Sequence, residues 1–351
     1  MSDSTLRFTR EWTRLEQRGV LTRLADAELR ESALCLEREA FESADLGIFL
    51  SVIATYGLGA PILREVGREL PKGAVLSVAI TEPNAGSDPR ALQSRLHEEG
   101  TQLRLRGQKW CITNAPVATH AIVFCRHTAT QRACAVLLDC NQAGVRASAP
   151  LHTIGALSSP TGSFDFDVVV PRTDLLGVIG DGERLMALAF VRERLLAPWP
   201  LLGMAARVLQ LALRHARVRE QFGAPIAQQQ HMQARLVRAY EHYLSARALA
   251  LDTLSTYEGA QPIELRASLV KARAAAMAEH VVREAIAVLA SRGVQQAARL
   301  GEYLQDAVCA SIAGGTEEIH RRVVFDALCM NSLRVQRGQR SVSFPYSIVE
   351  T

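Results

Sequence analysis

The stretch Ile80-Thr-Glu-Pro-Asn-Ala-Gly-Ser-Asp88 follows a short apolar run and places hydroxyl, carboxylate and glycine residues in a row. Taken from its residues, it is a strand that runs into a turn whose backbone N–H groups and hydroxyls suit a phosphate or the polar edge of a ring. A second stretch, Gly107-Gln-Lys-Trp-Cys-Ile-Thr-Asn114, places an aromatic ring and a hydroxyl on a strand of the same region. Taken alone, the first stretch is better explained as a plain surface turn and the second as a half-buried strand.

The hydrophobic period of the chain changes twice. From about residue 6 to residue 70, apolar residues recur every three or four positions, which is typical of helices. Between residues 75 and 170 the period is two, and Gly, Asn, Asp and Pro separate the apolar runs, which favours a mostly antiparallel sheet. After Gly182 the helical period returns. The expected helices are 184–219, with a bend at Pro198 and Pro200, 228–257, 263–290 and 297–330.

These periods predict an α+β multidomain fold. We expect an N-terminal helical domain over residues 1–75, a middle antiparallel β domain over 76–178 and a C-terminal helical bundle over 179–351. Four long helices joined by short connections make a four-helix bundle.

The charge balance argues against a nucleic-acid partner, because 40 Lys and Arg oppose 36 Asp and Glu for a net charge of +4. Only Lys72, Lys109 and Lys271 are lysines, and we attribute this skew toward arginine to coding bias. The seven cysteines are odd in number and form no C-x-x-C pair. Reduced thiols and a cytoplasmic location are therefore expected.

Membrane and metal sites are not expected either. The N-terminus lacks the basic and apolar pattern of a signal peptide. Residues 46–63 are uncharged, but they include three glycines and Pro61, so we predict a buried core helix rather than a membrane span. The histidines form no H-E-x-x-H or His/Cys ligand cluster, and no nucleophile elbow, P-loop or dinucleotide fingerprint is present.

Five ordered motifs resemble the acyl-CoA dehydrogenase family over about residues 41–328. The first is the stretch that ends in Ser87 and Asp88. The others are Trp110-Cys-Ile-Thr-Asn114, Gly155-Ala-Leu-Ser-Ser159 before Phe164-Asp-Phe-Asp-Val-Val-Val-Pro171, Arg219-Glu-Gln-Phe-Gly223, and Gly314-Gly-Thr-Glu-Glu-Ile-His-Arg321. The resemblance implies FAD bound between the β domain and the bundle, with an acyl thioester on the opposite face of the flavin.

The resemblance also implies roles for single residues. Thr81 would hydrogen-bond the pyrimidine edge of the flavin, Thr113 would reach N5, and Cys111 would hold the place of the tryptophan that packs on the ring. Ser87 would lie near the pyrophosphate and the substrate arm. The residues implied at the adenosine end, or at the FAD of a neighbouring subunit, are Arg219, Gln221, Gln229, Gln230, Thr316 and Glu318. A site shared in this way implies a homodimer or homotetramer.

The catalytic base departs from the commonest family pattern. The proton next to a thioester carbonyl is weakly acidic, so the base must be a carboxylate in a dry site. Most members place a glutamate directly before the Gly-Thr of the last motif, where this chain has Gly314. Members similar to isovaleryl-CoA dehydrogenase supply it from the first bundle helix, and Glu193 matches that position. Arg194, Gly314 and Gly315 would line the substrate site. The alternative is that Glu193 is not catalytic and is one charge of a solvated Arg-Glu-Arg face.

Two further departures concern FAD and the acyl pocket. The motif that brings glycines to the pyrophosphate survives only as Ala287-Val-Leu-Ala-Ser-Arg-Gly-Val294, so FAD would be held differently there. The N-terminal helical domain is shortened relative to the family, and it covers one wall of the acyl pocket. A tethered acyl group on a carrier protein is therefore a rival to acyl-CoA.

The expected activity is FAD-dependent α,β-dehydrogenation of an acyl thioester, with Glu193 as base and flavin N5 as hydride acceptor. An electron-transfer partner or oxygen would reoxidise the flavin. Two alternatives stay open: a flavin oxidase or monooxygenase on the same fold, and a non-catalytic family member. No nucleic-acid or membrane partner is expected.

Overall fold

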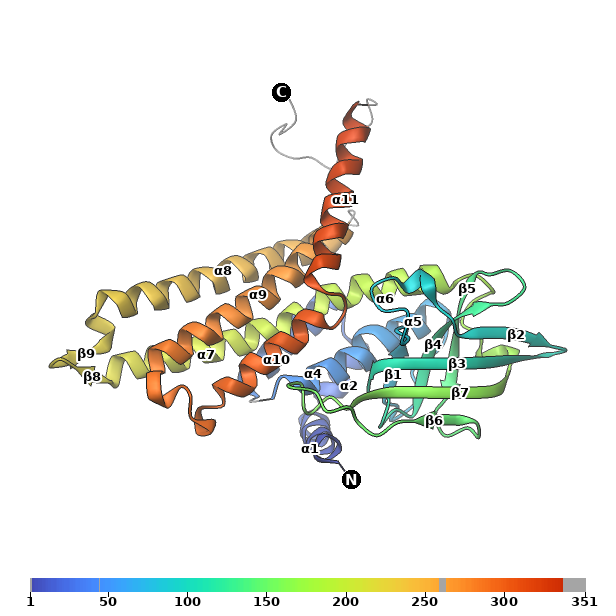
Figure 1. Ribbon diagram of the computed structural model, residues 1–351, viewed down its shortest axis with the longest axis horizontal. Helices are drawn as coiled ribbons and strands as arrows, with labels where there is room; N and C mark the ends of the chain where they lie inside the picture. Colours follow the sequence, from blue (N-terminus) through green and yellow to red (C-terminus); the bar gives the residue numbers. More distant parts are fainter. Residues whose placement is uncertain (1, 44, 259–262, 337–351) are drawn as a thin grey trace.

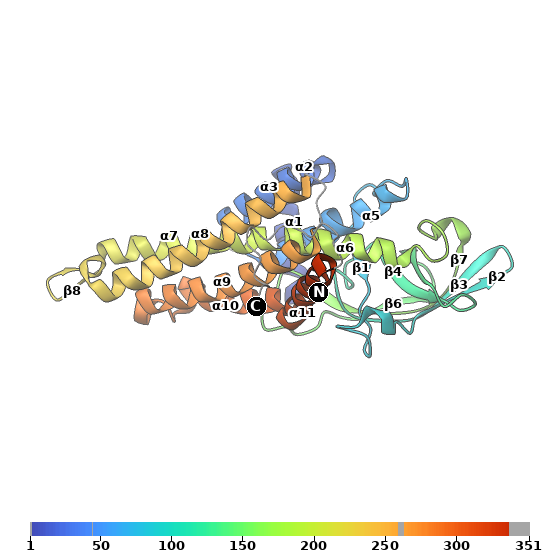
Figure 2. The ribbon, with the colours of Figure 1, turned by 90° about the horizontal axis from the view of Figure 1, so that it is seen from above.

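The computed structural model describes residues 2–43, 45–258 and 263–336. A helical bundle and a β domain lie at opposite ends of the long axis, and the N-terminal helices pack beside their junction (Figures 1 and 2). The N-terminal elements are α1 (Asp3–Gln17), α2 (Val20–Asp26), α3 (Leu29–Glu42), α4 (Gly47–Val52), the π-helical turn η1 (Ile53–Gly59) and α5 (Ala60–Glu65). The architecture confirms the predicted order of helices, sheet and helices.

The β domain is a seven-stranded sheet in the order β1-β4-β2-β3-β7-β6, with β5 paired to β4. Its strands are β1 (Leu76–Ala79), β2 (Arg95–Glu99), β3 (Gln102–Thr113), β4 (His120–His127), β5 (Ala133–Asp139), β6 (Val145–Ala147) and β7 (Thr161–Pro171). Pairing is antiparallel except where β4 meets β1 and β2 in parallel. Alternating side chains such as Leu103, Leu105 and Phe164 fill a buried core, because successive residues of a strand point to opposite faces.

The bundle contains α7 (Pro198–Val218), α8 (Gln230–Glu258), α9 (Glu264–Leu289) and α10 (Leu300–Ile312), and α6 (Gly182–Leu196) leads into it from the sheet. A two-stranded hairpin, β8 (Glu220–Gln221) and β9 (Ala224–Pro225), caps its far end. The short helices are η2 (Pro89–Ala91), η3 (Arg172–Asp174), η4 (Ile226–Gln228), η5 (Ala290–Arg292) and η6 (Gln296–Ala298). The predicted helix 184–219 is two helices divided at Ala197, because Pro198 and Pro200 begin a new helix there.

The prediction of one last helix over 297–330 is wrong. α10 ends at Ile312 and α11 (Glu317–Gln336) starts in another direction and projects away from the bundle (Figure 1). The turn between them contains Gly314 at φ 70° and Gly315 at φ 113°. Glycine adopts these left-handed conformations without a Cβ clash, so the chain can reverse there.

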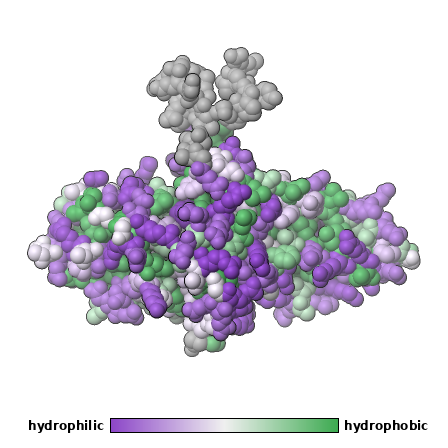
Figure 3. All heavy atoms as spheres, turned by 180° about the vertical axis from the view of Figure 1, so that it is seen from behind, coloured by the Kyte–Doolittle hydropathy of each residue, from purple (hydrophilic) through white to green (hydrophobic). Residues whose placement is uncertain are grey.

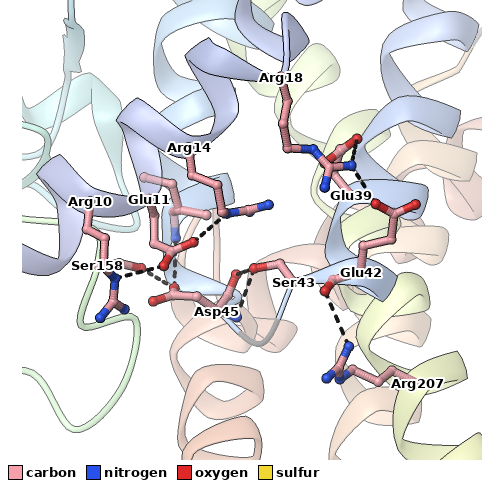
Figure 4. A network of polar contacts seen from close by, with 11 residues as sticks. Arg10, Glu11, Arg14, Arg18, Glu39, Glu42, Ser43, Asp45, Ser158 and Arg207 are labelled. Atoms are coloured by element: carbon pink, nitrogen blue, oxygen red, sulfur yellow. Dashed lines mark hydrogen bonds and ion pairs between the residues drawn. The ribbon is translucent and has the colours of Figure 1, made fainter.

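A polar network joins the N-terminal helices to the other two regions (Figure 4). Arg18 pairs with Glu39 and Glu42, and the Asp45 carboxylate accepts a hydrogen bond from the Ser158 hydroxyl of the β domain. Arg207 of α7 donates to the carbonyl oxygen of Phe41 at 3.0 Å. The loop before α4 is therefore fixed against both the sheet and the bundle.

Two helical stretches, Gly47–Glu65 and Gly182–Val218, are long and apolar enough to cross a membrane by length and composition. In each, 78% of the most apolar window is buried inside the protein. The face seen from behind carries hydrophilic residues along its whole length, with apolar ones interspersed (Figure 3). Both stretches are core helices of this fold, as predicted for residues 46–63.

Candidate active site

Glu193 lies on the last full turn of α6 and points at the turn between α10 and α11. Its side chain is 9% exposed, and its Oε2 has no hydrogen-bond partner among the described residues. A Cβ added at Gly314 would lie 1.9 Å from the carboxyl carbon and from both carboxyl oxygens of Glu193. The carboxyl group therefore occupies the place into which a side chain at position 314 would extend.

Burial raises the pKa of Glu193, and the nearby charges of Lys271 and Arg194 oppose that rise. A carboxylate in a dry site is a stronger base than one in water, because its charged form is poorly solvated. Proton abstraction is thus the chemistry that this group suits.

A small cavity of about 20 Å³ opens beside Glu193. Its walls come from four elements: Leu46, Phe49 and Ile53 from the N-terminal helices, Ala156 from the β domain, Leu201 from α7 and Ala310 from α10. Asp306 of α10 also lines it and accepts a 2.6 Å hydrogen bond from the backbone N–H of Ala156. Burial raises the pKa of Asp306 to about 7. The cavity is otherwise apolar, as an acyl chain requires.

Arg194 turns away from this cavity. One of its terminal nitrogens donates to the Ser268 hydroxyl of α9 at 3.3 Å, and its side chain is buried. Burial lowers the pKa of Arg194, and Glu193 opposes that shift. Arg194 thus contributes a charge within the bundle rather than a wall of the cavity.

The two β-domain motifs meet where β1 ends and β3 bulges. The backbone N–H of Trp110 donates to the carbonyl oxygen of Thr81 at 2.9 Å, and the register of β3 against β7 shifts between Lys109 and Ile112. Cys111 adopts φ 55° at this bulge and is exposed, while Trp110 is 43% exposed. Thr81 and Thr113 are half-buried and Ser87 is exposed.

The sequence analysis missed a buried ion pair behind Thr81. The Lys109 ammonium, 0% exposed, donates to Glu82 at 2.7 Å and to the carbonyl oxygen of Ile80 at 2.9 Å. Glu82 also accepts from the backbone N–H groups of Gln93 and Ser94. The pair fixes the residues on both sides of Thr81. The rarity of lysine in this chain was the signal that could have found it.

Thr316 and Glu318 lie at the start of α11, directly after Gly314 and Gly315. The Thr316 carbonyl oxygen accepts from the backbone N–H of His320 at 3.1 Å. Hydrogen bonds from its own backbone N–H and from Thr316 lower the pKa of Glu318. This pair therefore adjoins the turn beside Glu193.

Four predicted residues lie elsewhere. Arg219 and Gln221 are exposed at the β8–β9 hairpin, and Gln229 and Gln230 follow at the start of α8. This hairpin is at the end of the bundle opposite the β domain (Figure 1). The structure does not bring these side chains together with Thr81, Thr113 or Glu193 within the chain.

Two family models match this chain: "Acyl-CoA dehydrogenase, middle domain" over residues 77–169 and "Acyl-CoA dehydrogenase, C-terminal domain" over residues 180–329. The chain belongs to the acyl-CoA dehydrogenase family. The family carries out FAD-dependent dehydrogenation of acyl thioesters, so the chain is an oxidoreductase with FAD as its cofactor. The resemblance inferred from the five motifs is confirmed.

The relatives act on several kinds of acyl group. An L-prolyl-[peptidyl-carrier protein] dehydrogenase of Pseudomonas fluorescens is 28% identical over 84% of this chain and 81% of its own length. A benzylmalonyl-CoA dehydrogenase of Aromatoleum aromaticum is 30% identical over 71% and 66%. The prolyl acyl carrier protein oxidase AnaB shares the fold, with a TM-score of 0.85, 23% identity and coverage of 90% and 89% of the two chains.

The residues at the strand ends fit the acyl-CoA dehydrogenase cofactor. Half-buried hydroxyls at Thr81 and Thr113, beside a partly exposed Trp110, offer a ring edge both hydrogen bonds and a flat apolar neighbour. The eroded 287–294 segment does not offer the pyrophosphate an open glycine. A Cβ at Gly293 would lie 2.7 Å from the carbonyl oxygen of Ile286, so this glycine is needed for packing at the end of α9.

Proposed function

We propose that this acyl-CoA dehydrogenase family member removes the α-proton of its acyl thioester with Glu193. The observation that carries the proposal is the overlap between the Glu193 carboxyl group and the side-chain position of Gly314. The Glu193 carboxyl group thus lies at the root of the side chain that a glutamate at residue 314 would carry, in the same part of the site. The absence of a glutamate at residue 314 removes no chemistry from the site.

The chain's own residues supply the conditions for this step. The apolar walls keep water from the carboxylate, which strengthens it as a base. Thr81 and Thr113 would hold the ring edge of FAD, and bound FAD supplies the acceptor for the β-hydride. Ser87, exposed on the loop after β1, would contact the thioester arm. Gly314 leaves room for the Glu193 carboxyl group, and Gly314 and Gly315 would line the substrate site beside it.

We further propose that the acyl group is presented either by a carrier protein or by CoA. The carrier-protein assignment is supported by the prolyl-carrier-protein relative, which matches over most of both chains. The remaining proposals are a cytoplasmic location and a homo-oligomer in which Arg219, Gln221, Gln229 and Gln230 reach a neighbouring subunit's FAD.

The test is anaerobic reduction of the bound flavin by short branched acyl-CoA thioesters and by acyl-carrier-protein thioesters. At least one class should bleach the flavin absorbance, and Glu193→Gln should slow the bleaching by about 10²–10⁴-fold, the usual contribution of a general base. Glu183→Gln is the matched control, because Glu183 is an exposed acid of the same helix.

Full bleaching rates in Glu193→Gln would refute Glu193 as the base. Bleaching by neither substrate class would refute thioester dehydrogenation and favour the flavin oxidase alternative. Adding oxygen or an electron-transferring flavoprotein to the reduced enzyme then identifies the acceptor by its rate of flavin reoxidation.

A further inference from the structure

Lys271 of α9 is a buried cation enclosed by backbone carbonyls. Its side chain is 1% exposed, and its Nζ lies 2.9 Å from the carbonyl oxygen of Ala310, 3.1 Å from that of Gly315 and 3.5 Å from that of Ser311. An ammonium has three donors and a neutral amine has two. Three carbonyl acceptors therefore match the charged form.

Two of the three lysines of this chain are fully buried. Of the 40 basic residues, three are lysines; Lys72 is exposed, whereas Lys109 and Lys271 are fully buried. A guanidinium is larger and planar, and its fork cannot point three donors into a compact carbonyl cluster. Lys271 is thus a specific choice in a chain that otherwise uses arginine.

The carbonyl contacts place Lys271 and Glu193 at neighbouring residues of one turn. Lys271 binds the carbonyl oxygen of Gly315, and the Glu193 carboxyl group lies against the α-carbon side of Gly314. Burial raises the pKa of Glu193 and lowers the pKa of Lys271, and the opposite charge of each group offsets part of the other's shift. No ion pair within 4.0 Å joins the two among the described residues, so the coupling acts through space across the turn.

Other charged groups surround this turn. Arg194 of α6 is a second cation near Glu193, Asp306 of α10 lines the same cavity, and His320 of α11 is buried against Gly315. Burial, Lys271 and Arg194 lower the pKa of His320 to about 4, so it is neutral at pH 7. Among the described residues, Lys271 and Arg194 are the cations that act on Glu193. On its other side, Lys271 shares a pocket with Glu279, Arg283 and Glu317.

We infer that Lys271 is a positioning residue for the base: its Nζ binds the carbonyl oxygens on both sides of the Gly314–Gly315 turn and holds a positive charge beside the Glu193 carboxyl group. This rests on the proposed role of Glu193. Without the ammonium, the dry site favours the protonated carboxylic acid, which cannot accept a proton from substrate.

The test is the pH dependence of anaerobic flavin reduction at saturating substrate in Lys271→Met. An opposite charge close to a carboxylate shifts its pKa by about one unit or more. The acid limb should therefore move up by about one pH unit, with a loss of about tenfold below the limb and recovery toward the wild-type rate at pH values above it. The exposed Lys72→Met is the control, and its profile should match that of the wild type. An equal loss at every pH, with the limb unmoved, would mean that Lys271 only anchors the turn.

A second pair of variants keeps the inference testable if Lys271→Met does not fold. Lys271→Met leaves the buried Glu193 carboxylate with Arg194 alone as a nearby cation among the described residues, and the added Glu193→Gln removes that carboxylate charge as well. The double variant should recover soluble, folded protein, measured by yield and by thermal unfolding without substrate. Failure of the double variant to recover would overturn the coupling. Glu193→Gln alone tests the base itself, so a wrong base and a wrong Lys271 role give different results.

Discussion

Gly314→Ala most directly tests whether the Glu193 carboxyl group lies where the side chain of residue 314 would begin. The added Cβ would lie 1.9 Å from the Glu193 carboxyl atoms, whereas ordinary contacts begin near 3.4 Å. The carboxyl group must therefore retreat by about 1.5 Å. A displacement of about 1 Å of a catalytic group costs on the order of 100-fold in rate, so flavin reduction should fall by at least that factor.

The same substitution should lower the free energy of unfolding through two separable effects. A non-glycine residue in the left-handed conformation of Gly314 costs about 1–2 kcal/mol. Overpacking against Glu193 adds about 1–3 kcal/mol. In a Glu193→Ala background the Cβ of residue 314 no longer meets the carboxyl group. Gly314→Ala should then lower the free energy of unfolding only by the cost of the left-handed backbone conformation.

Urea unfolding of the wild type, the two single variants and the double variant measures this coupling, and stopped-flow flavin bleaching measures the rate. Gly315→Ala is a matched control for backbone strain. Its φ is 113°, but its Cβ would come no closer than 3.4 Å to His320. Its cost should be the same in the presence and absence of Glu193. Additive costs of Gly314→Ala and Glu193→Ala would refute the placement of the carboxyl group against residue 314.

Two further predictions concern buried carboxyl groups. The pKa of Asp306 is about 7 in the folded protein, against an ordinary value of 3.8. Between these pH values the folded protein binds a proton at Asp306 that the unfolded chain does not, so the free energy of unfolding should fall as pH rises. Asp306→Asn should remove up to about 4 kcal/mol of that fall, measured by urea unfolding from pH 4 to pH 8. Lys109→Met leaves Glu82 buried and unpaired and should cost about 3–5 kcal/mol, while adding Glu82→Gln should restore much of it; equal stability of the single and double variants would contradict the ion pair.

The periods of the sequence predicted the three regions because each period reports a local property, the face of one helix or strand that must be buried. They failed at the last helix. Gly314 and Gly315 interrupt an otherwise helical pattern, and glycine alone does not say whether a helix continues or turns. Lys271, on a helix distant in sequence, binds carbonyl groups on both sides of the turn before α11.

Motif order and residue type within the chain determined the family, and with it FAD and thioester dehydrogenation, because five short stretches of specific residues suffice to identify them. The sequence also offered Glu193 as an alternative base by its register. It could not show that Glu193 and Gly314 meet at one point, that Arg194 faces Ser268 rather than the cavity, or that Lys109 and Lys271 are buried cations. Those facts depend on packing between elements far apart in the chain, since burial and through-space charge set the pKa of a carboxylate and neither is a property of the residues beside it.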